Sequence, residues 1–286
     1  MRHFRLAFVP LLVAALLLIL SSGARAQAPG SATPAASHTL PLLQDRVPEA
    51  YRQNMPLPYG VSFTYFHLDE RLALSDPVLQ IPALGQTLQP PLVDTQSLKA
   101  VTRSYTAKFD AWLFPFLNVY ATATKFSGVA SDIKATSLIP TLPVQGLLPA
   151  SVDYDGKGFG FGFTAAFGYR SFFAAYNVSW SWNYLKMPTN TERATIQGPR
   201  AGIRLPRVSV YAGAMREHYA GRQTGSIDMP GIGALAFDLV AEPQHSWNPA
   251  LGAEIGISRN IHANVEYGFS GRNQLMLGAG YRFGGK

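Results

Sequence analysis

The chain has 286 residues, with 24 Lys and Arg against 17 Asp and Glu and no cysteine. The lack of cysteine excludes disulfides, thiolate catalysis, cysteine-based metal sites and lipid attachment at an N-terminal cysteine. Removing Arg2, Arg5 and Arg25, which belong to the export segment described next, leaves 21 against 17 and a formal charge of +4. A weak positive charge spread along the chain gives no support to nucleic-acid binding.

The N-terminus has the pattern of a secretory signal peptide. Arg2, His3 and Arg5 form a basic region, residues 6–20 are apolar, and Ala24-Arg25-Ala26 provides a small-x-small cleavage site. An uncleaved membrane anchor is the alternative, but the apolar run is short for a spanning helix. The sequence therefore predicts a signal peptide over residues 1–26 and export from the cytoplasm.

Residues 27–58 follow as a segment that is rich in Ala, Pro, Ser and Thr at first and mixed later. This composition predicts a flexible periplasmic lead-in. Residues 40–51 could dock somewhere or form a short helical turn, and no function is assigned to them.

From Tyr59 onward, apolar residues alternate with small or polar ones in about ten segments, each near the length of a tilted membrane strand. In the last segment, Leu275, Leu277 and Tyr281 share one parity, while the other parity holds Gln274 and Gly278. The expected strands are residues 59–68, 98–113, 117–126, 152–169, 172–183, 194–205, 208–219, 246–257, 261–269 and 274–283.

The connections between these segments alternate in length. Tight turns are expected at residues 114–116, 170–171, 206–207 and 259–260, and long connections at 67–96, 127–151, 184–193 and 220–245. Only the final connection, 270–273, breaks the alternation. Short periplasmic turns and long external loops are typical of outer-membrane barrels. Residues 59–286 are therefore predicted to form an all-β, antiparallel transmembrane barrel of about ten strands, located in the cell outer membrane.

A soluble periplasmic barrel that binds a ligand is the alternative fold. It would explain the same alternation, because its apolar residues would face an internal core. Two features disfavour it. The residues that alternate with the apolar ones are rich in glycine, which suits a crowded lumen more than a solvated exterior. Aromatic residues also gather near strand ends, as interfacial girdles do. Pro199 and Pro249 fall within or at the start of expected strands and conflict with them.

Three segments carry a resemblance to a group of bacterial outer-membrane β-barrels without an assigned activity: residues 58–61 (PYGV), 109–120 (FDAWLFPFLNVY) and 152–156 (VDYDG). The resemblance implies surroundings of outer-membrane lipid and lipopolysaccharide. It also implies insertion by the barrel-assembly machinery, which reads a C-terminal strand that ends in an aromatic residue. Here Phe283 is followed by Gly284-Gly285-Lys286, a departure from that pattern.

By parity, eight charged or titratable residues are expected to line the lumen: Lys108, Asp110, Arg200, Arg204, Glu254, His262, Glu266 and Arg282. Because desolvated charges need partners, we expect pairs of Arg204 or Arg282 with Glu254 or Glu266. These residues could line a selective pore or form a network that closes the lumen. A barrel of about ten strands is only slightly wider than the eight-stranded kind that side chains fill, which favours closure.

Two motifs at the outer strand ends suggest a rim-active hydrolase as an alternative function. His67-Leu68-Asp69 and Asp153-Tyr154-Asp155 each present both polar groups on one face of a strand. They resemble the Asp pair and Asp-His pair that omptin proteases use to activate water. Their order is reversed here and the rest of the chain does not resemble that family, so polar residues beside loops are the favoured interpretation.

No other motif predicts catalysis or a cofactor. No histidine is followed by serine two positions later, as in outer-membrane lipid hydrolases, and the histidines lack metal-ligand spacing. The glycines of residues 156–162 alternate with phenylalanines and belong to a strand rather than to a nucleotide loop. The sequence therefore favours a non-enzymatic barrel that serves as a narrow solute pore or as a surface structural or interaction protein. It does not specify the oligomeric state.

Overall fold

The computed structural model describes residues 40–48, 55–81, 85–88, 93–137, 151–186, 190–219, 221–229 and 233–284. The predicted signal peptide, residues 1–26, lies outside these residues. The structure contains one short 3-10 helix and 13 strands: η1 (Gln44–Arg46), β1 (Tyr59–Ile81), β2 (Gln86–Leu88), β3 (Val93–Phe114), β4 (Leu117–Ser137), β5 (Ser151–Tyr169), β6 (Phe172–Leu185), β7 (Asn190–Arg204), β8 (Val208–Tyr219), β9 (Gly221–Met229), β10 (Gly233–Pro243), β11 (Trp247–Gly256), β12 (Ile261–Gly268) and β13 (Arg272–Phe283). None of the described residues forms a helix that is long and apolar enough to cross a membrane.

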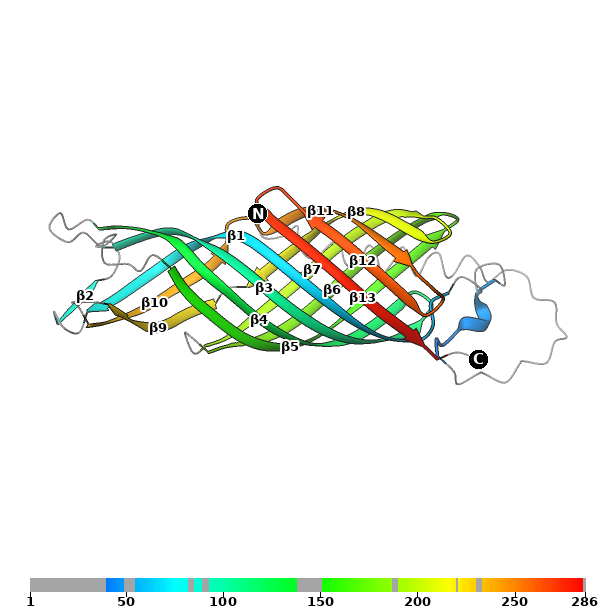
Figure 1. Cartoon of the computed structure of the whole chain (residues 1–286), viewed down its shortest axis with the longest axis horizontal. Helices are drawn as coiled ribbons and strands as arrows, with labels where there is room; N and C mark the ends of the chain where they lie inside the picture. The colour runs from blue at the N-terminus through cyan, green and yellow to red at the C-terminus, as the bar shows by residue number, and fades with distance from the viewer. Residues whose placement is uncertain are drawn as a thin grey trace, which may run out of the picture. The chain divides into compact units, whose positions relative to one another are not determined.

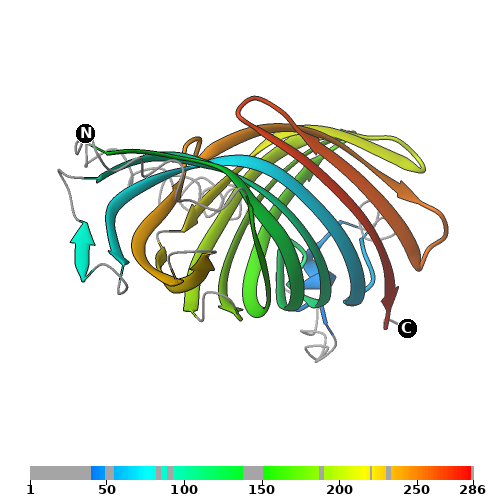
Figure 2. The same cartoon turned by 60° about the vertical axis from the view of Figure 1, so that its left-hand side comes forward.

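Ten of these strands form a closed antiparallel barrel, as predicted. The ring runs β1, β3, β4, β5, β6, β7, β8, β11, β12 and β13, and β13 pairs with β1 to close it. Figures 1 and 2 show these strands inclined steeply to the barrel axis, as closure of a sheet requires. The tight turns after β3, β5, β7 and β11 lie at the end that holds Tyr59 and Phe283, here called the turn end; the opposite end is the loop end.

The ladder between β1 and β13 is continuous. It runs from Tyr59↔Phe283 at the turn end to Glu70↔Arg272 near the loop end without a shift in register. Closure gives every strand of the ring a hydrogen-bonded neighbour on both sides, which removes the exposed edges that lipid cannot satisfy.

The outer surface of the barrel is apolar. Phe63, Phe109 and Leu251 are all more than 50% exposed, and Phe161 and Leu277 are exposed as well. The parity that holds these side chains therefore points away from the barrel, whereas the soluble-barrel alternative requires it to form a core. An apolar outer band between polar ends is the surface of a membrane barrel.

The strands extend further at the loop end than the sequence predicted. β1 continues to Ile81 and β4 to Ser137, and the long connections at residues 67–96 and 220–245 contain the further strands β2, β9 and β10. The apolar alternation ends where contact with lipid ends, but backbone pairing does not need it and continues beyond.

The β9–β10 hairpin fills a gap in the barrel wall. The β12–β13 hairpin ends at the level of Glu70, and beyond that point β10 replaces β13 as the partner of β1, with Leu72↔Pro243 and Leu74↔Ala241 in register. In Figure 1, β9 and β10 accordingly lie beyond the end of the β12–β13 hairpin. The wall thus continues past the shortest hairpin.

Both prolines that conflicted with strand predictions lie in strands. Pro199 in β7 lies where the β7–β8 ladder is interrupted between Gln197 and Arg200. Pro249 in β11 lies opposite Ala214, and its carbonyl accepts a hydrogen bond from the backbone of Phe269. An interrupted ladder accommodates a residue that has no N–H to donate.

The described part of the N-terminal segment contacts the turn end of the barrel. The backbone N–H of Leu42, next to η1, donates to the carbonyl of Leu113 at 2.8 Å. Nearer the barrel, the carbonyl of Pro58 accepts from Trp112 at 2.8 Å, and that of Leu57 accepts from the Arg282 guanidinium at 2.9 Å. The short helical turn expected at residues 40–51 is present as η1.

The outward position of Leu277 yields a test of the membrane orientation. We expect Leu277→Arg to lower the free energy of unfolding in lipid vesicles by about 2–4 kcal/mol, because it places a charge on the lipid-facing band. The adjacent inward variant Met276→Gln is the control and should change stability much less. Denaturant titration in vesicles measures both. Equal losses in the two variants would contradict the assigned faces.

Candidate functional site: the barrel interior

A continuous cavity of about 760 Å³ lies inside the barrel. Arg204 and Ser209, beside the turn between β7 and β8, line it near the turn end. Leu74 and Phe237 line it at the loop end. Among the described residues, the cavity therefore extends along most of the barrel.

Inward glycines make room for large side chains from neighbouring strands. A Cβ at Gly252 would collide with the ring of Tyr211, and a Cβ at Gly162 would collide with Tyr120. The Tyr120 hydroxyl donates to Asn177 Oδ1 at 2.8 Å, so its ring is held against the wall. The glycine-rich parity thus gives the aromatic rings a place beside the wall, and the centre of the barrel stays open.

The middle of the cavity is lined by small hydroxyl-bearing side chains. They come from β1, β3, β4 and β6: Ser62, Thr64, Thr106, Thr122, Thr124, Ser179 and Ser181. Hydroxyls both donate and accept hydrogen bonds, so this stretch can replace part of the hydration of a passing polar solute.

The predicted lumen residues lie on the inward face and are here called the inner charged zone. Most of them are toward the turn end, whereas Glu266 lies near the β12–β13 turn, where it accepts a hydrogen bond from Gln274. Five of them line the cavity: Lys108, Arg200, Arg204, Glu254 and His262. The other three, Asp110, Glu266 and Arg282, are held in ion pairs.

The predicted pairing of these residues is wrong in detail. Glu266 pairs with Arg200 at 2.7 Å, and Arg282 pairs with Asp110 at 2.8 Å. Asp110 also accepts a hydrogen bond from Asn118 at 2.7 Å. Arg204 instead lies over the Phe173 ring, 5.8 Å from its centroid. The alternation along each strand identified the inward residues. Their ion-pair partners depend on the register between strands that are distant in the ring, and the sequence does not give that register.

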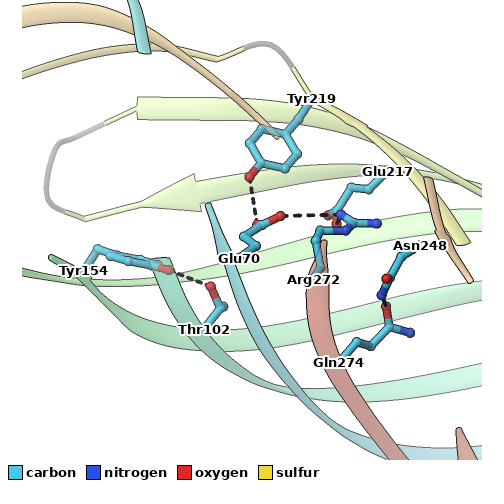
Figure 3. Close-up of polar contacts among 8 residues, drawn as sticks. All are labelled: Glu70, Thr102, Tyr154, Glu217, Tyr219, Asn248, Arg272 and Gln274. Atoms are coloured by element: carbon cyan, nitrogen blue, oxygen red, sulfur yellow. Dashed lines mark hydrogen bonds and ion pairs between the residues drawn. The ribbon is translucent and has the colours of Figure 1, made fainter. Parts of the chain in front are cut away.

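A second polar cluster, the outer ring, lies near the loop end and was not predicted. It comprises Glu70, Glu192, Glu217, Tyr219 and Arg272. The Arg272 guanidinium is 2.9 Å from Glu217 and 3.5 Å from Glu70, and the Tyr219 hydroxyl donates to Glu70 at 3.0 Å (Figure 3). The Arg272 side chain is only 1% exposed, so these carboxylates are its main source of compensation.

A separate hydrogen-bonded chain begins beside the outer ring, at the next inward residue of β13. Gln274, next to Arg272 on the same face of β13, accepts from Asn248 at 3.2 Å (Figure 3) and donates to Glu266 at 3.3 Å. Glu266 is the partner of Arg200. One wall of the interior, from β1 through β13 to β8, is therefore tied together by polar contacts.

The outer ring lies beyond the lipid-facing band. Its members alternate along their strands with charged or polar outward residues. Asp69, beside Glu70, pairs with Lys99 at 3.0 Å, while Arg193, His218 and Asn273 are exposed beside the other members. Charges on the outer face are costly in lipid, so this level is at or above the membrane boundary.

Burial shifts the titration of the ring carboxyls. Burial, with the nearby charge of Glu217, raises the pKa of Glu192 to about 7. Burial and Glu217 also raise the pKa of Glu70 to about 7, although Arg272 acts in the opposite direction. Burial raises the pKa of Glu217 as well. The charge of the ring therefore changes near neutral pH.

The two rim motifs do not come together. His67 and Asp69 share the outward parity of Phe63 in β1, and Asp153 and Asp155 share that of Phe159 in β5. Two strands, β3 and β4, separate β1 from β5 in the ring. Asp155 pairs with Lys186 and Asp69 with Lys99, so the omptin-like arrangement is not formed. No group of three or more His, Cys, Asp or Glu suited to a metal ion occurs in the described part of the chain.

No protein-family model matches the chain, and no curated protein matches its sequence. Solved structures similar to the barrel include the transport unit of the autotransporter AIDA-I from Escherichia coli, at a TM-score of 0.40 and 10% identity over 80% of this chain and 90% of that one. The translocator domain of the autotransporter NalP from Neisseria meningitidis gives 0.38 and 11%, over 84% and 95%. The P. putida toluene transporter TodX gives 0.31 and 9%, over 85% and 92%. At these values none of them indicates what this chain does.

The outer ring yields a test that compares a single variant with a triple variant. We expect Arg272→Gln to destabilise the protein by about 3–5 kcal/mol, because it leaves Glu70 and Glu217 buried without a cation. Adding Glu70→Gln and Glu217→Gln should recover most of the lost free energy of unfolding. Unfolding titrations of the single and triple variants measure this, and a triple variant no more stable than Arg272→Gln would argue against the ring.

The raised pKa of Glu192 predicts how stability depends on pH. The folded state binds this proton more tightly than the unfolded state, so the contribution is present at acidic pH and is lost as pH rises through about 7. In unfolding titrations from about pH 5 to pH 8, Glu192→Gln should remove a decline on the order of 1–3 kcal/mol. The same decline in the variant and in the parent chain would rule this out.

Proposed function

We propose that the protein is a non-enzymatic outer-membrane barrel that forms a narrow channel for small solutes. The continuous interior cavity carries the proposal, because side chains fill the interior of barrels that are purely structural. Its volume of about 760 Å³ is comparable to pockets that hold a single drug-sized molecule. A channel of this size accepts small solutes one at a time.

The arrangement of the interior charges supports passage. Charges toward both ends are held in pairs, such as Arg282 with Asp110 and Arg272 with Glu217. Paired charges stay in place, so they do not collapse across the opening. Along β1, β3 and β4, the paired Thr64, Thr106 and Thr124 lie one inward position toward the loop end from Lys108 and offer hydrogen bonds without fixed charge.

The location and surroundings form part of the same proposal. The N-terminal pattern supports export with cleavage after residue 26, and the apolar exterior supports contact with outer-membrane lipid and lipopolysaccharide. The aromatic Phe283 at the end of the closing strand supports insertion by the barrel-assembly machinery.

A conductance measurement with a matched pair of variants tests the channel. We expect single-channel events from the refolded protein in planar bilayers, and a strongly reduced conductance for Thr122→Trp, which places an indole in the cavity. Ala123→Trp puts the same side chain on the outward, exposed face of β4 and should leave conductance unchanged.

Absence of conductance in the folded parent protein would refute the channel. In that case a surface structural or interaction role, which the extended loop end could serve, becomes the better explanation.

A further inference from the structure

The cavity changes character beyond the outer ring. Its walls there are aliphatic and aromatic, and we call this part the vestibule, defined by Leu72, Leu74, Leu98, Ile133, Phe237 and Leu239. Three alanines, Ala100, Ala130 and Ala241, also line it, and Gln223, opposite Leu239 in β9, is a polar residue in the same wall. Since the outer ring already lies at the membrane boundary, the vestibule is on the loop side of the membrane, where no lipid requires apolar residues.

The walls of the vestibule come from segments that are distant in sequence. Leu72 in β1 pairs with Leu98 in β3 on one side and with Pro243 in β10 on the other. Leu74 pairs with Ala241, and both side chains are at most 6% exposed. The β9–β10 hairpin thus contributes one side of the apolar chamber through Phe237, Leu239 and Ala241.

The hairpin sorts its residues between the two faces of the sheet. Phe237 and Leu239 face the cavity, whereas Asp238 between them forms a bidentate ion pair with Arg222 of β9, at 2.7 and 2.8 Å. A hairpin that served only to extend the barrel in water would gain nothing from an apolar inner face that leaves a cavity. An apolar wall around a hollow instead favours an apolar occupant.

The charge along the cavity favours an uncharged solute. When its carboxyl groups are ionised, the outer ring holds three carboxylates, Glu70, Glu192 and Glu217, against the single guanidinium of Arg272. Because burial raises the pKa of Glu70 and of Glu192 to about 7, this negative excess is smaller at neutral pH than above it. The inner charged zone has the opposite excess: the cations Lys108, Arg200 and Arg204 are present against Glu254 and Glu266. With the ring carboxyls ionised, an ion of either sign meets like charge in one of the two regions. With Glu70 and Glu192 protonated, the outer ring still holds no excess of cations that would attract an anion. A neutral solute avoids these costs in both protonation states.

We propose that the vestibule is a binding site for compact, uncharged organic molecules with an apolar body and one or two hydrogen-bonding groups. The apolar body lies against Leu72, Leu98 and Leu239, and the polar group faces the hydroxyls of Thr102 and Tyr154 or the outer ring. This inference rests on the proposed channel, for which it names the class of solute.

Equilibrium dialysis with tritiated 2-naphthol tests the site, using the full chain in lipid nanodiscs. Empty nanodiscs measure partition into the bilayer. We expect a saturable component with the protein that is roughly tenfold weaker in Leu239→Gln, because the amide must be desolvated against the ligand. Val240→Gln, which places the same group on the opposite face of β10, should bind like the parent protein. If Leu239→Gln fails to fold, Leu72→Asn takes its place.

Three outcomes would overturn the proposal. These are no saturable binding above partition into empty nanodiscs, equal loss in Leu239→Gln and Val240→Gln, or binding of anionic 2-naphthoate as tight as that of 2-naphthol. The test distinguishes failure of the binding site from failure of the proposed channel. Conductance without 2-naphthol binding leaves the channel and removes this site, whereas binding without conductance leaves a binding site and removes the channel.

Discussion

The architecture depends on the hydrogen-bonded closure between β1 and β13. In lipid an unpaired strand edge leaves every second backbone group unsatisfied, so a membrane sheet must close. The unshifted ladder from Tyr59↔Phe283 to Glu70↔Arg272 provides that closure. It also fixes which side chains face inward on both strands, and thereby brings Glu70 beside Arg272. The position of Glu70 and Arg272 in the outer ring follows directly from the β1–β13 ladder.

The interior stays hollow because large and small residues are placed in complementary positions on neighbouring strands. The rings of Tyr120 and Tyr211 lie over inward glycines, flat against the wall, and hydrogen bonds such as Tyr120 to Asn177 hold them there. Glycine in a strand lowers stability by itself. Here it leaves room for a tyrosine side chain beside the barrel wall. Narrowness and openness are thus compatible in a barrel of only ten strands.

The structure divides into a membrane barrel and an extension at its loop end. The two parts follow different rules, because lipid dictates the outer face of the first and water surrounds the second. The outer ring lies at the junction, where outward residues such as Asp69 and Arg193 become charged. Beyond it the apolar side chains are on the inside, as in a soluble protein, but they surround a cavity. This reversal makes the vestibule the part of the molecule least explained by membrane insertion alone.

The sequence by itself determined the approximate positions of the ten barrel strands, the barrel class and, within those strands, which alternate residues face inward. Local alternation and turn chemistry carry that information, and Leu275 to Phe283 is the clearest example. Only the tertiary structure decided which inward charges meet, as Arg200 with Glu266, and that the His67 and Asp155 motifs lie on strands separated in the ring. It also decided that β10 joins β1. These outcomes depend on register between segments distant in the chain, and hydrophobic alternation contains no record of that register.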